Sequence, residues 1–114
     1  MLNKPDILKN LMLDIADATI AASIASREFL GLGDEKAADQ AAVEAMRAVL
    51  DRLPMSGKIV IGEGERDEAP MLYIGEKLGA GGVELDIAVD PLEGTTILAQ
   101  GRNNALSVIA IAKA

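Results

Sequence analysis

Acidic side chains and one glycine–threonine turn are the residues of this chain that could do chemistry. The stretch from Glu63 to Glu93 holds nine acidic and two basic residues, whereas acids and bases balance in the rest of the chain. The 114 residues include no His and no Cys, which excludes a Ser-His-Asp triad, an imidazole base, a thiol nucleophile and a metal site built on His or Cys. Any chemistry must therefore use carboxylates, hydroxyls, Lys or Arg, or a hard metal ion.

Several of these acids follow short apolar strands. The strand predicted at residues 59–61 delivers Glu63, and the strand predicted at residues 85–89 delivers Asp90, with Glu93 in the next turn. If the two strands are neighbours in one sheet, their ends bring these three carboxylates together. Crowded carboxylates repel one another, and a shared proton or a divalent cation is the usual remedy.

Asp39 is a further candidate, because it falls on the apolar stripe of a helix that is predicted to begin after Asp34. A carboxylate on a buried helix face needs a partner. The alternative is an acid that the helix dipole favours near the N-terminus and that pairs with Lys36 or Arg47. The pattern leaves both interpretations open.

The turn Gly94-Thr95-Thr96 opens a predicted helical turn that ends at Gly101. Free backbone N–H groups and a hydroxyl at a helix start suit a phosphate oxygen, although an ordinary capping turn has the same pattern. The position favours an anion site, because Glu93 and Asp90 are close by in the chain. An anion site beside a cation site is the layout of metal-assisted phosphoryl transfer.

The elements that must position these residues form an α/β (α+β) layered fold. Two long helices are predicted first, followed by the short strands and helices of a central mixed sheet. We expect Asp90-Pro91 to end the second strand, since Pro91 cannot extend a ladder, and we expect Glu76 on a solvated face. The helices are predicted at residues 5–30, from the cap Asp34 to about residue 53 and at residues 67–78, and the strands at residues 59–61, 85–89 and 105–112.

Composition narrows the class of protein. The net charge of −7 argues against nucleic acid as a partner. The apolar stretch at residues 11–26 carries Asp14 and Asp17, which suits neither a membrane span nor a signal peptide, so we expect a cytoplasmic protein. The core must be aliphatic and rich in alanine, because aromatic residues make up only 2%. The last strand is apolar and nothing follows to cover it, so we expect an N-terminal piece of something larger or one part of an obligate assembly.

Three motifs resemble one enzyme family. Asp90-Pro-Leu-Glu93-Gly-Thr95 is similar to the D-P-[IL]-[DE]-G-[ST] signature of lithium-sensitive, metal-dependent phosphatases. The run Ile59-Val-Ile-Gly-Glu-Gly-Glu-Arg-Asp-Glu-Ala-Pro-Met-Leu-Tyr-Ile-Gly-Glu-Lys77 resembles class II fructose-1,6-bisphosphatase, a bacterial type also found as a dual fructose/sedoheptulose bisphosphatase. Gly33-Asp-Glu-Lys-Ala-Ala-Asp39-Gln-Ala-Ala-Val43 supports the same family.

The resemblance implies a sugar-phosphatase fold and hydrolysis of the 1-phosphate of fructose 1,6-bisphosphate, a step of gluconeogenesis, by in-line attack of a metal-bound water. It implies Mn²⁺ or Mg²⁺ as the cofactor. The implied metal ligands are Asp39, Glu63, Asp90 and Glu93. The implied phosphate-holding residues are Glu93, Gly94 and Thr95, and the implied catalytic residues are Asp67, with Glu65 beside it to activate the water, and Thr95.

The chain departs from the family at Glu35-Lys36-Ala37, where many members have Lys-Asn-Thr. Family members are also much longer, and the part absent here holds a further metal-ligating Glu and most contacts to the sugar. We expect residues 1–114 to be the N-terminal metal- and phosphate-binding portion of a homo-oligomeric enzyme with a sugar bisphosphate as its partner. Three alternatives are sedoheptulose 1,7-bisphosphate as substrate, an inositol phosphate or nucleoside bisphosphate as substrate, and a non-catalytic module that assembles through exposed sheet edges.

Overall fold

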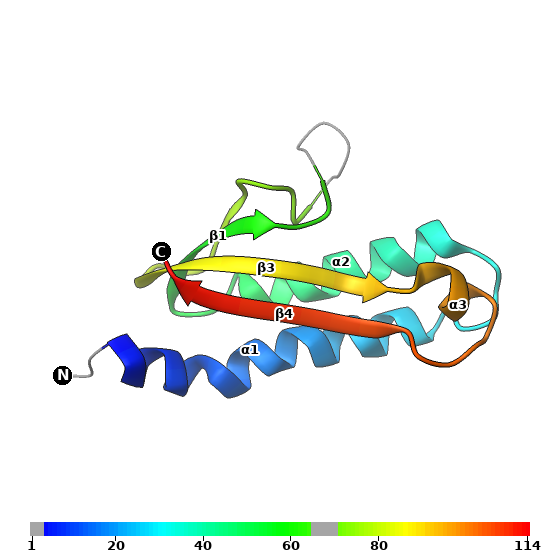
Figure 1. The fold of residues 1–114 in the computed structure, drawn as a ribbon, viewed down its shortest axis with the longest axis horizontal. Helices are drawn as coiled ribbons and strands as arrows, with labels where there is room; N and C mark the ends of the chain where they lie inside the picture. Colours follow the sequence, from blue (N-terminus) through cyan, green and yellow to red (C-terminus); the bar gives the residue numbers. More distant parts are fainter. Residues whose placement is uncertain (1–3, 65–70) are drawn as a thin grey trace.

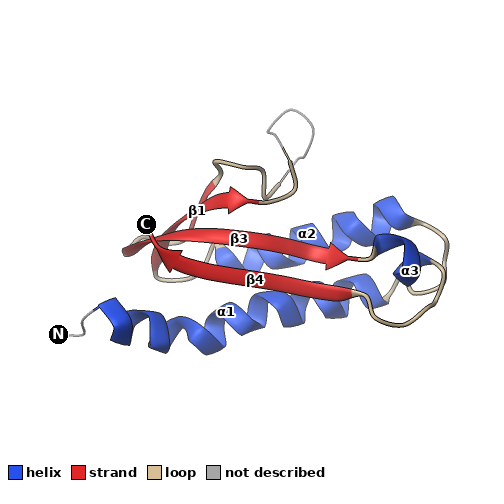
Figure 2. Ribbon diagram, in the orientation of Figure 1, coloured by secondary structure: helices blue, strands red, loops and turns tan. Residues whose placement is uncertain are grey.

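A layer of two helices packs against one face of a four-stranded mixed sheet (Figures 1 and 2). The computed structural model describes residues 4–64 and 71–114. This arrangement is the α/β layered fold that the sequence predicts. In chain order the elements are α1 (Lys4–Arg27), α2 (Glu35–Leu50), β1 (Met55–Ile61), β2 (Lys77–Leu78), β3 (Val83–Glu93), α3 (Thr95–Ala99) and β4 (Leu106–Lys113).

Alanines at the helix interface allow the helix layer to pack closely. Ala18 and Ala22 of α1 and Ala38 and Ala42 of α2 are fully buried, and the core contains no buried aromatic ring among the described residues. The side chain of Asp34 caps α2 by accepting a hydrogen bond from the backbone N–H of Ala37 at 3.0 Å. Both long helices are confirmed within a few residues of their predicted bounds.

The strand order is β2-β1-β3-β4, with β1 and β3 parallel and the two outer pairs antiparallel. The register pairs Ile59 with Ile87, and both of these side chains are fully buried against the helices. Because β1 and β3 run in the same direction, both point toward the same end of the sheet, and β1 ends opposite Ala88 while β3 continues to Glu93 (Figure 1).

The helix predicted at residues 67–78 is wrong over residues 71–78, and residues 67–70 lie outside the described residues. Residues 71–78 form turns and the short strand β2 instead. Two backbone hydrogen bonds tie them to the preceding strand: the N–H of Gly75 donates to the Ile59 carbonyl, and the N–H of Ile59 donates to the Glu76 carbonyl. Positive φ angles at Leu72 (55°) and Gly75 (96°) are incompatible with a continuous α-helix.

The second predicted strand is confirmed, but it does not end at Asp90-Pro91. Strand β3 runs on to Glu93, and its register against β4 shifts between Asp90 and Glu93. An irregularity of this kind accommodates Pro91, which has no N–H to give to a ladder and is fully buried here.

The face of the sheet opposite the helices carries exposed apolar side chains. Ile61 is 64% exposed, Leu106 56% and Val108 45%, whereas Ile109 and Ile111 on the helix side of β4 pack against the core. The last strand is thus confirmed, with one face covered by helices and the other open among the described residues. No helix in the described part of the chain is long and apolar enough to cross a membrane.

Two glycines in the β2–β3 connection allow a test of how closely this connection packs against Met55. Gly79 (φ 110°) and Gly81 (φ 106°) have nearly the same φ, but a Cβ at Gly79 would overlap the Met55 carbonyl, while one at Gly81 would meet open space. We expect Gly81→Ala to cost about 1–2 kcal/mol of unfolding free energy for its positive φ alone. Gly79→Ala should cost roughly 1–3 kcal/mol more from overpacking. Urea unfolding of both variants measures the difference, and equal losses would contradict the packing described here.

Candidate metal centre

The carboxyl ends of β1 and β3 place two of the predicted metal ligands at the same edge of the sheet. Glu63 follows β1 after Gly62, and Asp90 lies near the end of β3. Glu63 is half-buried, whereas Asp90 is exposed. The neighbouring strands on which the prediction depended are present, because β1 and β3 pair directly.

Backbone contacts fix the loop that carries Glu63. The N–H of Glu63 donates to the Leu72 carbonyl at 2.9 Å, and the Gly64 carbonyl accepts from the N–H of Ile74 at 2.8 Å. A Cβ at Gly62 would overlap the Leu72 carbonyl, so only glycine allows this approach. The loop is therefore held against residues 72–74 rather than free at the strand end.

Asp39 supplies the second carboxyl of the centre. It lies in the first half of α2, is partly buried, and forms a side-chain hydrogen bond with Glu63. The alternative that Asp39 pairs with Arg47 is wrong, since the ion pairs of Arg47 are with Glu76 and Asp51, and none of the ion pairs found among the described residues joins Asp39 to Lys36. The helix that covers the sheet thus delivers a carboxylate to the strand ends.

The electrostatics of the pair follow from its burial. Burial, then the charge of Asp39, the hydrogen bond to it and the charge of Asp90 together raise the pKa of Glu63 from 4.5 to about 7. Burial also raises the pKa of Asp39, the hydrogen bond to Glu63 opposes that rise, and the charge of Asp90 adds to it. A pKa of about 7 means that below neutral pH Glu63 holds a proton beside Asp39, which is one of the two remedies expected for crowded acids.

The four predicted metal ligands do not all lie in contact with one another. Asp39 and Glu63 touch, Asp90 acts on both through its charge, and Glu93 is exposed at the end of β3. Within residues 4–64 and 71–114, no three acidic side chains converge closely enough to hold a metal ion as they stand. The predicted catalytic residues Glu65 and Asp67 lie outside the described residues.

The predicted phosphate turn has the expected backbone and an unexpected neighbour. Gly94 caps α3 in the left-handed conformation (φ 90°), as a glycine can. The hydroxyls of Thr95 and Thr96 both donate to one carboxylate oxygen of Glu35, the first residue of α2. The sequence did offer a signal, since Glu35 stands where many members of the resembled family have Lys.

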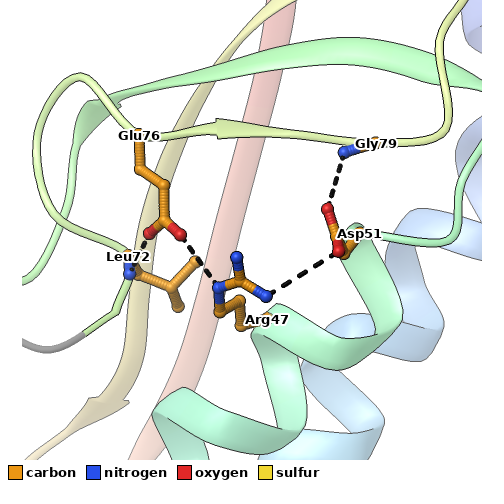
Figure 3. Close-up of polar contacts among 5 residues, drawn as sticks. All are labelled: Arg47, Asp51, Leu72, Glu76 and Gly79. Atoms are coloured by element: carbon orange, nitrogen blue, oxygen red, sulfur yellow. Dashed lines mark hydrogen bonds and ion pairs between the residues drawn. The ribbon is translucent and has the colours of Figure 1, made fainter.

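Sequence reasoning missed Glu76, which is only 6% exposed rather than solvated (Figure 3). Its Oε1 accepts from the Leu72 N–H at 2.5 Å, and its Oε2 pairs with Nε of Arg47 at 2.8 Å. The second guanidinium contact of Arg47 is with Asp51 at 3.8 Å. Glu76 lies two residues before the buried Leu78, so in an extended segment both side chains would point to the same buried face. The helix predicted over these residues excluded that interpretation.

The raised pKa of Glu63 makes the metal-free chain sensitive to pH. The folded state holds the proton more tightly than the unfolded state, so the stabilising contribution is complete below pH 4.5 and is lost as the pH rises through about 7. We expect the thermal midpoint in chelator to fall between pH 5 and pH 8, and Glu63→Gln to flatten this dependence. Glu84→Gln, at an exposed site on β3, is the control, and an unchanged slope in Glu63→Gln would contradict the assignment.

Comparison with known proteins places the chain in the family that its motifs resemble. A family model described as bacterial fructose-1,6-bisphosphatase, glpX-encoded, matches residues 9–114. A D-fructose 1,6-bisphosphatase class 2/sedoheptulose 1,7-bisphosphatase of Synechococcus sp. (strain JA-2-3B'a(2-13)) is 50% identical over 116 residues, which cover 90% of this chain and 33% of the relative. The fructose-1,6-bisphosphatase 1 class 2 of Escherichia coli (strain K12) is 53% identical over 104 residues, or 90% of this chain and 31% of the relative.

The chain therefore spans about a third of the length of these curated relatives. The match with the family model nevertheless covers most of α1, all of α2, the sheet and the acidic centre described above. The chain belongs to the glpX-encoded family of bacterial fructose-1,6-bisphosphatases.

Proposed function

We propose that residues 1–114 form the metal- and phosphate-binding portion of an enzyme that hydrolyses the 1-phosphate of fructose 1,6-bisphosphate. One observation carries the proposal: in a chain of this family, the carboxyls of Asp39 and Glu63 meet by a hydrogen bond at the carboxyl ends of two parallel strands. Both relatives described above carry fructose-1,6-bisphosphatase in their names, and this supports the choice of substrate.

The donor set suits a hard divalent cation. All of the candidate ligands are carboxylate oxygens, the preferred donors for Mg²⁺ and Mn²⁺. A cation would replace the proton that Asp39 and Glu63 share and relieve the repulsion from Asp90. In the proposal Asp39, Glu63, Asp90 and Glu93 hold the metal, which supplies positive charge to the phosphate and to the leaving oxygen.

This chain's own residues would do the rest. Gly94 and Thr95 bind the phosphate through the backbone and a hydroxyl, with Glu93 beside them. Asp67, with Glu65 two positions before it in the sequence, takes the proton of the attacking water. A sedoheptulose bisphosphate is the second candidate substrate, because the Synechococcus relative is named for both sugars. The cytoplasmic location and the homo-oligomeric state stay parts of the proposal that rest on sequence alone.

The direct test measures phosphate release from fructose 1,6-bisphosphate with Mn²⁺ or Mg²⁺ and with chelator, together with Mn²⁺ binding by electron paramagnetic resonance. Substituting a residue that hydrogen-bonds to a metal ligand costs roughly 10–100-fold in metal affinity or activity. Asp90 is itself a proposed ligand, so we expect Asp90→Asn to weaken Mn²⁺ binding, and to slow any phosphate release, by about a hundredfold. Asp86→Asn, on the same strand, is the matched control. A chain that binds no Mn²⁺, or an Asp90→Asn variant that binds as the parent does, would refute the proposed metal site.

Glu35 provides a separate test of the phosphate turn. Its carboxylate accepts from Thr95 and Thr96, so a negative charge stands where the phosphate would bind. One unit charge about 4 Å away in water is worth about 1 kcal/mol, and we expect Glu35→Gln to tighten the binding of inorganic phosphate to the Mn²⁺-loaded chain roughly fivefold. Calorimetric titration measures this, with Glu44→Gln, an exposed site on the same helix, as control. Unchanged phosphate affinity in Glu35→Gln would place the phosphate away from these hydroxyls.

A further inference from the structure

The buried carboxylate of Glu76 has no part in the chemistry proposed above, yet it is fully engaged. One oxygen accepts from the Leu72 N–H, and the other pairs with Arg47, whose side chain is 32% exposed (Figure 3). Burying a carboxylate costs several kcal/mol of solvation, and buried charges are therefore found paired and hydrogen-bonded. The question is what this arrangement holds in place.

The held residue is Leu72, which is conformationally unusual. Its φ of 55° is uncommon for a residue with a Cβ, and its side chain is fully buried in the core. Such a backbone persists only where its surroundings enforce it. Here the buried side chain and the hydrogen bond from its N–H to Glu76 do so from two sides.

The other end of the Leu72 residue faces the acidic centre. Its carbonyl accepts the backbone N–H of Glu63 at 2.9 Å, and it lies so close to Gly62 that a Cβ there would overlap it. A continuous chain of contacts thus runs from Arg47 through Glu76 and Leu72 to the backbone of Glu63.

Helix α2 fixes Glu63 in two separate ways. Asp39 engages its carboxyl directly, and Arg47 reaches its backbone through Glu76 and Leu72. The two α2 residues are eight positions apart, which is about 12 Å along the helix axis. A shift of the loop against the helix would have to break one of these contacts.

We propose that the Arg47–Glu76 ion pair is a positioning device that sets the backbone of Glu63 so that its carboxyl meets Asp39. The inference rests on the proposed function in one respect, namely that Glu63 ligates the metal. Loss of the pair would remove none of the acids of the centre but would move the carboxyl of Glu63 away from Asp39. Glu76 and Arg47 are positioning residues, because neither touches the centre itself.

Glu76→Gln is the sharpest variant, because the amide keeps the size of the side chain and an oxygen for the Leu72 N–H while removing the charge that pairs with Arg47. Arg47→Met removes the positive charge that pairs with Glu76, at the more exposed residue of the pair, and Arg47→Lys keeps that charge. Asp51→Asn is the matched control, since it changes the other acid beside Arg47 and retains an oxygen for the Gly79 N–H.

Two readouts separate positioning from general stability. The first is the Mn²⁺ affinity of the folded chain, and the second is the hydrogen-exchange rate of the Glu63 amide relative to the Ile87 amide in the central strand. We expect Glu76→Gln and Arg47→Met to weaken Mn²⁺ binding and to speed exchange at Glu63 by about tenfold each. Arg47→Lys should recover part of both effects, and Asp51→Asn should stay within about twofold of the parent in both.

The outcomes distinguish the two proposals. A parent chain that binds no Mn²⁺ overturns the metal site, while the exchange rates still decide whether the ion pair holds Glu63. A parent that binds Mn²⁺, with Glu76→Gln and Arg47→Met equal to it in affinity and in Glu63 exchange, overturns the positioning role and leaves the metal site standing. Equal acceleration at Glu63 and Ile87 also overturns it, because that pattern belongs to a global loss of stability.

Discussion

The parallel ladder between β1 and β3 is the constraint on which the rest of the structure depends. Pairing Ile59 with Ile87 in the same direction sends both strands toward one edge, and the residues that follow are acidic. Parallel strands cannot be joined by a tight turn, so a long connection must cross between them. Here that connection contains Glu63, Leu72 and Glu76, which means that the segment required by topology also supplies one carboxyl of the centre and the residues that hold it.

Helix α2 turns this topology into a defined geometry. It touches the β1–β3 connection at three levels: Asp39 at the Glu63 carboxyl, Arg47 at Glu76, and Asp51, which accepts from the N–H of Gly79 at 3.2 Å. The buried residues of the same helix, which include Ala42 and Met46, pack into the core. Helix α2 therefore holds the β1–β3 connection through its polar side chains and packs on the core through its apolar face. A change in the packing of the helix would also change the geometry of the centre.

Local signals predicted much of this fold. The cap Asp34, the Ala-rich stripes and the acids at strand ends are properties of neighbouring residues, and they predicted the two long helices, the three longer strands and the position of Glu63 and Asp90 at strand ends. Only the resemblance to the family grouped Asp39 with Glu63. The failures involve distant partners. Glu76 is buried because Arg47, 29 residues earlier, pairs with it, and Leu72 departs from helix geometry because contacts to the core and to Glu63 outweigh local propensity. Periodicity within one segment carries no information on such partners. Pro91 likewise ended the predicted strand, whereas the register shift against β4 accommodates it.

The open face of the sheet has a consequence for the behaviour of the chain in solution. Leu106 and Val108 are exposed on β4, the outer strand of the sheet formed by the described residues, and Ile61 is exposed on β1. Exposed apolar side chains and an outer strand together favour stacking and edge-to-edge association of copies. Mutual repulsion from a net charge of −7 opposes this, and it vanishes near the isoelectric point of about 4.5. A bound divalent cation would lower the net negative charge, by one where it releases the proton held by Asp39 and Glu63, so metal binding would weaken the repulsion that keeps copies of this chain apart.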